Sequence, residues 1–248
     1  MNLYISELEF FNSALDDLPS KKVLINTLNA YCYDIAQEDS FYSQALISSD
    51  ILLPDGISIV LAKLALNKIR LKKIAGADLF FYEMKRLNDT SGKCFFLGSS
   101  PSTLDRIKKR AKNEYPNVRI FSYSPPFVSD FSRCDSQKMI LAVNKCKPDV
   151  LFIGMTAPKQ EKWAYKHFNE LDAGHICSIG AVFDFFAGNI NRAPVWMINL
   201  GFEWFYRLLK EPRRLWRRYL IGNFVFIRFI ILEKIRLFAK KNFKITPA

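Results

Sequence analysis

Polar side chains that could do chemistry follow apolar runs in this sequence, where buried strands would end. Asp55 comes directly after the apolar residues 51–54, and Gln160 follows the run 150–153, with Pro158 between them. Proline suits the first turn of a helix, so Gln160 is expected in the first turn of a helix that follows a strand. A carboxylate can accept a proton from an alcohol, and an amide can orient a substrate by hydrogen bonds. The pattern is typical of a ligand site at the ends of strands.

Other polar residues occupy similar places. Thr27 and Asn29 alternate at the end of an apolar run, so they share one face of that strand end. Gly98 ends a further run, and Asp184 follows another. Each has a purely structural interpretation as well: a strand end, a turn or a capped helix. For Asp55, which stands in the turn sequence Pro-Asp-Gly, both the turn and the catalytic carboxylate remain open.

The elements that must position these residues alternate between strands and helices. Strands are expected at 23–29, 50–56, 93–98, 118–121, 150–153 and 175–179, with helices between them. This alternation predicts an α/β fold with a Rossmann-like parallel sheet flanked by helices. In such sheets ligands bind outside the carboxyl ends of the strands, where helix N-termini favour anions. One crevice can therefore collect Asn29, Asp55, Gly98, Gln160 and Asp184.

The composition of the chain changes near residue 192 and becomes basic and rich in aromatic residues. This change divides a core of residues 1–192 from a helical appendage of residues 193–248. The appendage is expected to form helices at 194–210, 212–220 and 222–238. From residue 203 to the end, twelve Lys and Arg against three Glu contribute +9 of the net charge of +12. A basic, aromatic-rich segment favours an anionic partner, and its apolar content suits an anionic membrane surface. The competing interpretation is a helix that docks on the core or on another subunit, as in a homo-oligomer.

The composition argues against a metal site, disulfide bonds and a signal peptide. Five cysteines without CxxC spacing and only two histidines favour reduced thiols in a cytosolic protein without a metal site. The first residues lack the basic segment and apolar core of a signal peptide. The sequence contains no Asp-x-Asp metal–diphosphate clamp and no GxGxxG loop. A nucleic-acid binder would use the basic tail, but no nucleic-acid-binding motif is present.

Taken in order, several short motifs resemble the WecG/TagA/CpsF family of bacterial glycosyltransferases, glycosyltransferase family 26. The resemblance covers about residues 21–220. Its motifs are Thr27-Leu28-Asn29, Pro54-Asp55-Gly56, Ala75-Gly76-Ala77-Asp78-Leu79, Phe96-Leu97-Gly98, Pro158-Lys159-Gln160-Glu161, Gly180-Ala181-Val182-Phe183-Asp184-Phe185, Arg192-Ala193-Pro194, residues 201–207 and residues 211–219.

The resemblance implies a fold of the GT-E type and an inverting transferase that needs neither metal nor cofactor. The expected donor is a UDP-sugar of the N-acetylmannosamine or uronic acid type. The expected acceptor is a polyprenyl-diphosphate-linked sugar, used in cell-surface polysaccharide synthesis at the cytoplasmic face of the membrane, where the protein would be peripheral. The alternative is a membrane-associated regulatory module that binds a nucleotide without transferring anything.

The resemblance also assigns roles to residues. By position, Asp55 matches the general base, whereas the pocket residues are Thr27, Asn29, Gln160 and Asp184, beside the strand-end Gly98. Arg207, Arg214 and Arg217 match appendage arginines that close over the donor diphosphate. One departure concerns Lys73, because the family commonly has Arg there, and lysine neutralises phosphate as a point charge without a bidentate fork.

Overall fold

The computed structural model describes residues 3–243, without the side chains of Val195, Asn199, Arg214, Arg218, Asn242 and Phe243. A six-stranded parallel sheet forms its centre, in the order β2-β1-β6-β5-β3-β4. The strands are β1 (Val23–Leu28), β2 (Ile51–Pro54), β3 (Lys93–Gly98), β4 (Arg119–Tyr123), β5 (Val150–Gly154) and β6 (His175–Ser178). The predicted α/β class and the six predicted strands are confirmed, each to within a few residues.

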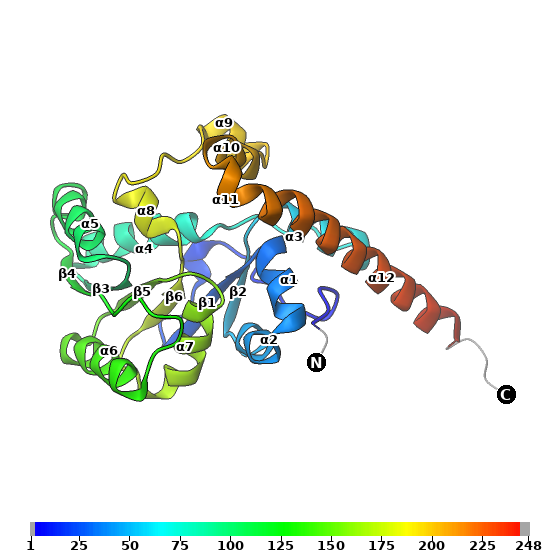
Figure 1. Ribbon diagram of the computed structural model, residues 1–248. Helices are drawn as coiled ribbons and strands as arrows, with labels where there is room; N and C mark the ends of the chain where they lie inside the picture. Colours follow the sequence, from blue (N-terminus) through cyan, green and yellow to red (C-terminus); the bar gives the residue numbers. More distant parts are fainter. Residues whose placement is uncertain (1–2, 244–248) are drawn as a thin grey trace.

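Helices cover both faces of the sheet (Figure 1). The core helices are α1 (Ala30–Glu38), α2 (Ser40–Ile47), α3 (Ile57–Asn67), α4 (Gly76–Thr90), α5 (Pro101–Glu114), α6 (Arg133–Cys146), α7 (Lys159–His167) and α8 (Val182–Phe186). Short 3-10 turns are η1 (Leu15–Asp17) and η2 (Phe168–Glu170). Two helices, rather than one, connect the first two strands. Asp39 ends α1 and caps α2 by accepting the Tyr42 N–H at 2.9 Å.

Strand side chains alternate between two apolar layers, as the two-residue period of a strand requires. Ile25, Phe96 and Phe152 pack on one face beneath α4, α5 and α8. Leu24 and Phe95 pack on the other face, against α6 and α7. A third cluster surrounds the β2 edge, where α1 to α3 meet the N-terminal segment and the last helix. Because β1, β5 and β6 are sandwiched between layers, their carboxyl ends are held at fixed positions.

The appendage contains α9 (Val195–Asn199), α10 (Glu203–Lys210), α11 (Pro212–Trp216), a π-helical turn η3 (Arg217–Ile221) and α12 (Gly222–Phe243). The single helix expected at 194–210 is a wrong prediction, because the chain breaks at Gly201, whose φ of +78° lies in the left-handed region. A side chain there would also press on Ile57 of α3. The break turns α10 back over the carboxyl ends of the strands, and α12 then runs along α1 and α3 (Figure 1).

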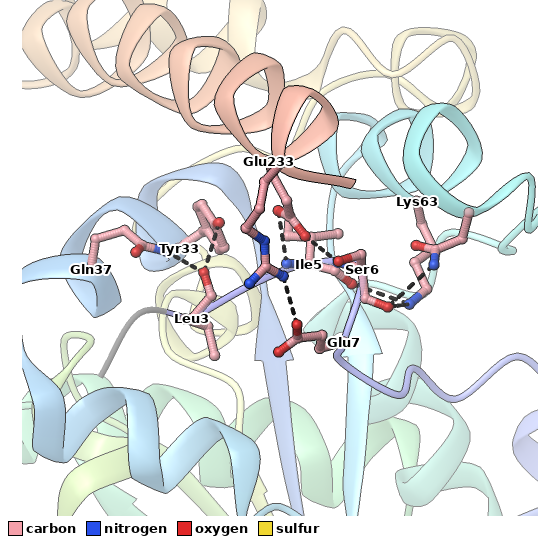
Figure 2. Close-up of polar contacts among 10 residues, drawn as sticks. Leu3, Ile5, Ser6, Glu7, Tyr33, Gln37, Lys63 and Glu233 are labelled. Carbon is pink, nitrogen blue, oxygen red and sulfur yellow. Dashed lines mark hydrogen bonds and ion pairs between the residues drawn. The ribbon is translucent and has the colours of Figure 1, made fainter. Parts of the chain in front are cut away.

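A buried carboxylate holds α12 against the N-terminal segment (Figure 2). Glu233 is 2% exposed and accepts the backbone N–H groups of Ile5 at 3.1 Å and Ser6 at 2.7 Å. From α3, the Lys63 ammonium donates to the carbonyls of Ile5, Ser6 and Leu8. The segment is therefore fixed between two helices that are distant in sequence.

Replacing Glu233 with Ala should lower the free energy of unfolding by about 2–4 kcal/mol, because two buried N–H groups would lose a charged acceptor. Chemical denaturation measures this loss, and hydrogen exchange should report faster opening of α12. Glu7→Ala is the matched control, since Glu7 pairs with Arg236 at 2.6 Å in an exposed position. Such surface pairs contribute about 1 kcal/mol or less. Equal losses in the two variants would contradict the role of Glu233.

Candidate active site

A cavity of about 1230 Å³ opens at the carboxyl ends of the strands. Its walls come from the loops after all six strands, and the appendage contributes residues that include Glu203, Trp204, Arg207 and Tyr219. Along the chain, β2 is added on one side of β1, whereas β3 and the later strands are added on its other side. Ligands of open parallel sheets usually bind at such a reversal of strand order. The cavity is somewhat larger than the roughly 300–1,000 Å³ of common ligand pockets. It can hold a nucleotide-sized donor and part of an acceptor.

Asp55 lies in the cavity wall at the end of β2. Its backbone N–H donates to the Leu28 carbonyl at 2.9 Å, which ties the β2 end to β1. Asn29 donates a side-chain hydrogen bond to the Asp55 carboxylate. The other end of the Asn29 amide caps α1 by accepting the Cys32 N–H at 3.0 Å. A cap that is fixed at both ends therefore orients the carboxylate.

The surroundings of Asp55 make it a better base than an ordinary aspartate. Burial, and next the negative charge of Glu203, raise the pKa of Asp55 to about 6. The bond from Asn29 and the positive charge of Lys73 oppose this rise. A general base works best when its pKa is close to the working pH. Lys73 lines the same cavity, and its ammonium also donates to the Ile198 carbonyl of α9 at 3.1 Å, which connects the core to the appendage.

Gln160 and Thr27 lie on the inner wall, and both are buried. The Gln160 carbonyl accepts the Met155 N–H at 3.1 Å, and its amide donates to Glu161 at 2.8 Å. These bonds fold the first turn of α7 back onto the loop after β5. The sequence correctly indicates that this helix begins beside the cavity.

Asp184 lies near the start of α8 on the cavity wall. Its carboxylate accepts the Asn189 amide at 3.1 Å. Asn189 in turn donates to Thr103 at 3.0 Å and accepts from Arg106 at 3.1 Å. A short network from α5 thus fixes the orientation of Asp184, and the sequence offers no signal for it because Asn189 is 86 residues from Thr103.

The three predicted appendage arginines differ in where the structure places them. Arg207 lines the cavity, with its guanidinium 5.5 Å from the centre of the Phe185 ring and its buried Nε without a hydrogen-bond partner among the described residues. Arg217 does not line the cavity and lies over the ring of Trp216 at 5.3 Å. The side chain of Arg214 lies outside the described residues. Glu203, which raises the pKa of Asp55, was not predicted as a site residue.

Gly98 is also absent from the cavity wall, where Ser99 and Ser100 take its place. Its φ is +122°, and a Cβ there would lie 2.5 Å from the Gly154 carbonyl oxygen. The glycine is required by the close approach of β3 and β5. The sequence correctly marks a special position but not its reason.

The site can deprotonate one hydroxyl and stabilise one anionic leaving group. Asp55 is the candidate base, whereas Lys73 and Arg207 supply positive charge to the same cavity. Helices α5 and α7 also begin at the cavity, and helix N-termini favour phosphate groups. This arrangement suits group transfer from a phosphorylated donor.

Comparison with known proteins finds transferases that act on a sugar linked to a lipid diphosphate. At 33% identity over 79% of this chain and 75% of its own length, one relative is the N-acetylglucosaminyldiphosphoundecaprenol N-acetyl-beta-D-mannosaminyltransferase of Bacillus subtilis (strain 168). The protein of the same name from Bacillus spizizenii (strain ATCC 23059 / NRRL B-14472 / W23) is 30% identical over 87% of this chain and 86% of its own. The protein of the same name from Staphylococcus aureus (strain MW2) is 25% identical over 84% and 80%.

A family model extends the match to nearly the whole chain. The model described as "Glycosyl transferase WecG/TagA/CpsF family" matches residues 3–240, which include the cavity and most of the appendage. The chain therefore belongs to the WecG/TagA/CpsF family of glycosyltransferases.

Proposed function

We propose that the protein transfers an N-acetylmannosamine-type or uronic acid sugar from a UDP-sugar to a polyprenyl-diphosphate-linked sugar, with inversion and without a metal. The observation that carries this proposal is the meeting of Asp55, Gln160 and Asp184 around one cavity that also contains Lys73 and Arg207. The names of the relatives supply the N-acetylmannosamine sugar and the type of acceptor.

The reaction follows from the placement of the charges. Asp55 takes the proton of the acceptor hydroxyl as the oxygen attacks the sugar carbon, and the bond from that carbon to the diphosphate breaks. UDP leaves as an anion, and Lys73 and Arg207 stabilise the charge that develops on it. A single displacement with one base inverts the configuration at the sugar carbon. Asp184 and Gln160 bind hydroxyl or amide groups of the sugars.

The experiment is incubation with a panel of UDP-sugars and a short-chain polyprenyl-diphosphate N-acetylglucosamine, with and without a metal chelator. We expect a lipid-linked disaccharide and an equal amount of free UDP, with an unchanged rate in the chelator. UDP binding without a disaccharide for any donor would contradict the proposal and favour the nucleotide-binding regulatory module. A rate that depends on added divalent cation would contradict the metal-independent mechanism.

We also propose that α12 attaches the enzyme to the cytoplasmic face of the membrane, where the lipid-linked acceptor is found. Within residues 3–243, none of the helices combines the length and apolarity that a bilayer span requires. The exposed side of α12 carries an apolar stripe at spacings of three and four: Phe224, Ile227, Ile231, Ile235 and Phe238. Exposed Arg228, Lys234, Lys240 and Lys241 accompany it. Such a helix lies in the interface, and each basic residue adds about 1 kcal/mol on anionic lipid.

Replacing both Phe224 and Ile231 with Glu should weaken binding to anionic vesicles at least about tenfold, because two inserted apolar groups are replaced by charges that the lipid repels. Vesicle flotation measures the bound fraction. Leu141→Glu is the matched control, since the exposure of Leu141 lies between those of Phe224 and Ile231 but Leu141 belongs to α6, away from the appendage. Unchanged flotation of the double variant would contradict membrane attachment through α12.

A further inference from the structure

Glu161 is a second buried carboxylate at the cavity that the proposed reaction does not use. It lies in the first turn of α7, lines the cavity and is 1% exposed. Its Oε1 accepts the Gln160 amide at 2.8 Å, whereas its Oε2 has no hydrogen-bond partner among the described residues. Burying a carboxylate that is not fully paired costs free energy, so such a group often has a functional reason. Burial raises the pKa of Glu161 to about 7, and the bond from Gln160 opposes this rise.

The neighbouring amide has its orientation fixed by two partners of opposite kind. The Met155 N–H can only donate, and it donates to Gln160 Oε1 at 3.1 Å. An ionised Glu161 can only accept, so Gln160 must turn its Nε2 toward it. The amide lies beside Gly180, where a Cβ would be 3.5 Å from Nε2 and 3.6 Å from Oε1. With both bonds made, Gln160 retains one N–H and one lone pair for a ligand.

We propose that Glu161 is a positioning residue for sugar transfer, which holds the Gln160 amide in the one orientation that offers its free N–H to an oxygen of the substrate. The inference rests on the proposed function, because it concerns the same site. Without Glu161 only the Met155 N–H restrains the amide. The amide can then turn more freely and present a lone pair of Oε1 where the substrate oxygen needs an N–H. A misplacement of about 1 Å in such a group can lower a rate about 100-fold.

A double-mutant cycle separates positioning from packing. The proteins are the wild type, Gln160→Ala, Glu161→Ala and the double variant, assayed at about pH 8, where Glu161 is mostly ionised. If Glu161 acts only through Gln160, each single variant should lower kcat/KM by about 10- to 100-fold and the double variant should be no slower than Gln160→Ala. Losses that multiply in the double variant, or a Glu161→Ala protein with wild-type kinetics, would overturn the inference.

Two further variants separate the loss of the Glu161 acceptor from a general disturbance of α7. Glu161→Gln keeps the volume and an acceptor oxygen, so it should fold and recover most of the activity that Glu161→Ala loses; a Gln variant as slow as the Ala variant would also overturn the inference. Lys162→Ala is the control on the same helix, since Lys162 pairs with Asp39 at 2.8 Å away from the cavity. It should keep wild-type kcat and KM.

The failure of this inference is distinguishable from the failure of the proposed function. Titration calorimetry with UDP-N-acetylmannosamine is run on the same four proteins of the cycle. A wild type that transfers no sugar contradicts the proposed function, whatever the cycle gives. The inference then stands or falls on binding: equal affinities of Gln160→Ala and the double variant support it, and independent losses contradict it.

Discussion

Replacing Asp55 with Asn should lower kcat for sugar transfer by about 10²- to 10⁴-fold, which is the usual contribution of a general base. Asparagine has the same shape and still fills the site next to Asn29, but it cannot take up a proton. The affinity for UDP should stay close to that of the wild type. Steady-state kinetics and titration calorimetry measure the two quantities.

The same substitution should stabilise the fold at about pH 8. Burial raises the pKa of Asp55 to about 6 in the folded protein, above its ordinary value of 3.8. The carboxyl group therefore ionises more readily in the unfolded chain than in the folded protein. As a result, the free energy of unfolding falls as the pH rises from about 4 to about 6. Asn carries no such cost, so the Tm of the variant should exceed that of the wild type. A variant that loses both activity and stability would indicate misfolding. Asp172→Asn, which makes the same substitution at an exposed position, is the control and should keep both the activity and the Tm of the wild type.

Replacing Arg207 with Ala should lower kcat/KM about 10²- to 10³-fold, the typical cost of one donor to a developing anion. Arg207 lines the cavity, and its Nε has no hydrogen-bond partner among the described residues, so it is available to an anionic ligand. Arg207→Lys should restore part of the loss, because it returns the charge without the planar fork.

Arg217→Ala is the matched control for this experiment. Arg217 belongs to the same basic appendage but lies over Trp216 outside the cavity. We expect its rate to stay within about threefold of the wild type, since an exposed charge contributes about 1 kcal/mol or less. Equal losses in the two variants would mean that the appendage acts through its overall charge rather than through Arg207.

Much of the fold was predictable because the local signals agree with the tertiary structure. Apolar runs such as 150–153 are too short for helices and end at glycine, and the structure contains all six predicted strands. The gathering of Thr27, Asn29, Asp55, Gln160 and Asp184 around one cavity follows from topology alone, because parallel strands end at one edge of the sheet.

The rest depends on contacts between distant parts of the chain. Glu233 is 228 residues from Ile5, so no local pattern indicates that α12 holds the N-terminal segment. The break at Gly201 becomes necessary only because α3 packs beneath it. Likewise, the spacing of the appendage arginines cannot distinguish Arg207, which enters the cavity, from Arg217, which does not.

The pH dependence of kcat/KM tests the assignment of Asp55 as the base most directly. Activity needs the ionised carboxylate, so the rate should be constant at high pH and fall about tenfold per unit below about pH 6. The negative charge of Glu203 raises this pKa and the positive charge of Lys73 lowers it. In Glu203→Gln the fall should therefore move to lower pH, and in Lys73→Met to higher pH. A profile that is flat from pH 5 to 8, or one that neither substitution moves, would contradict Asp55 as the catalytic base.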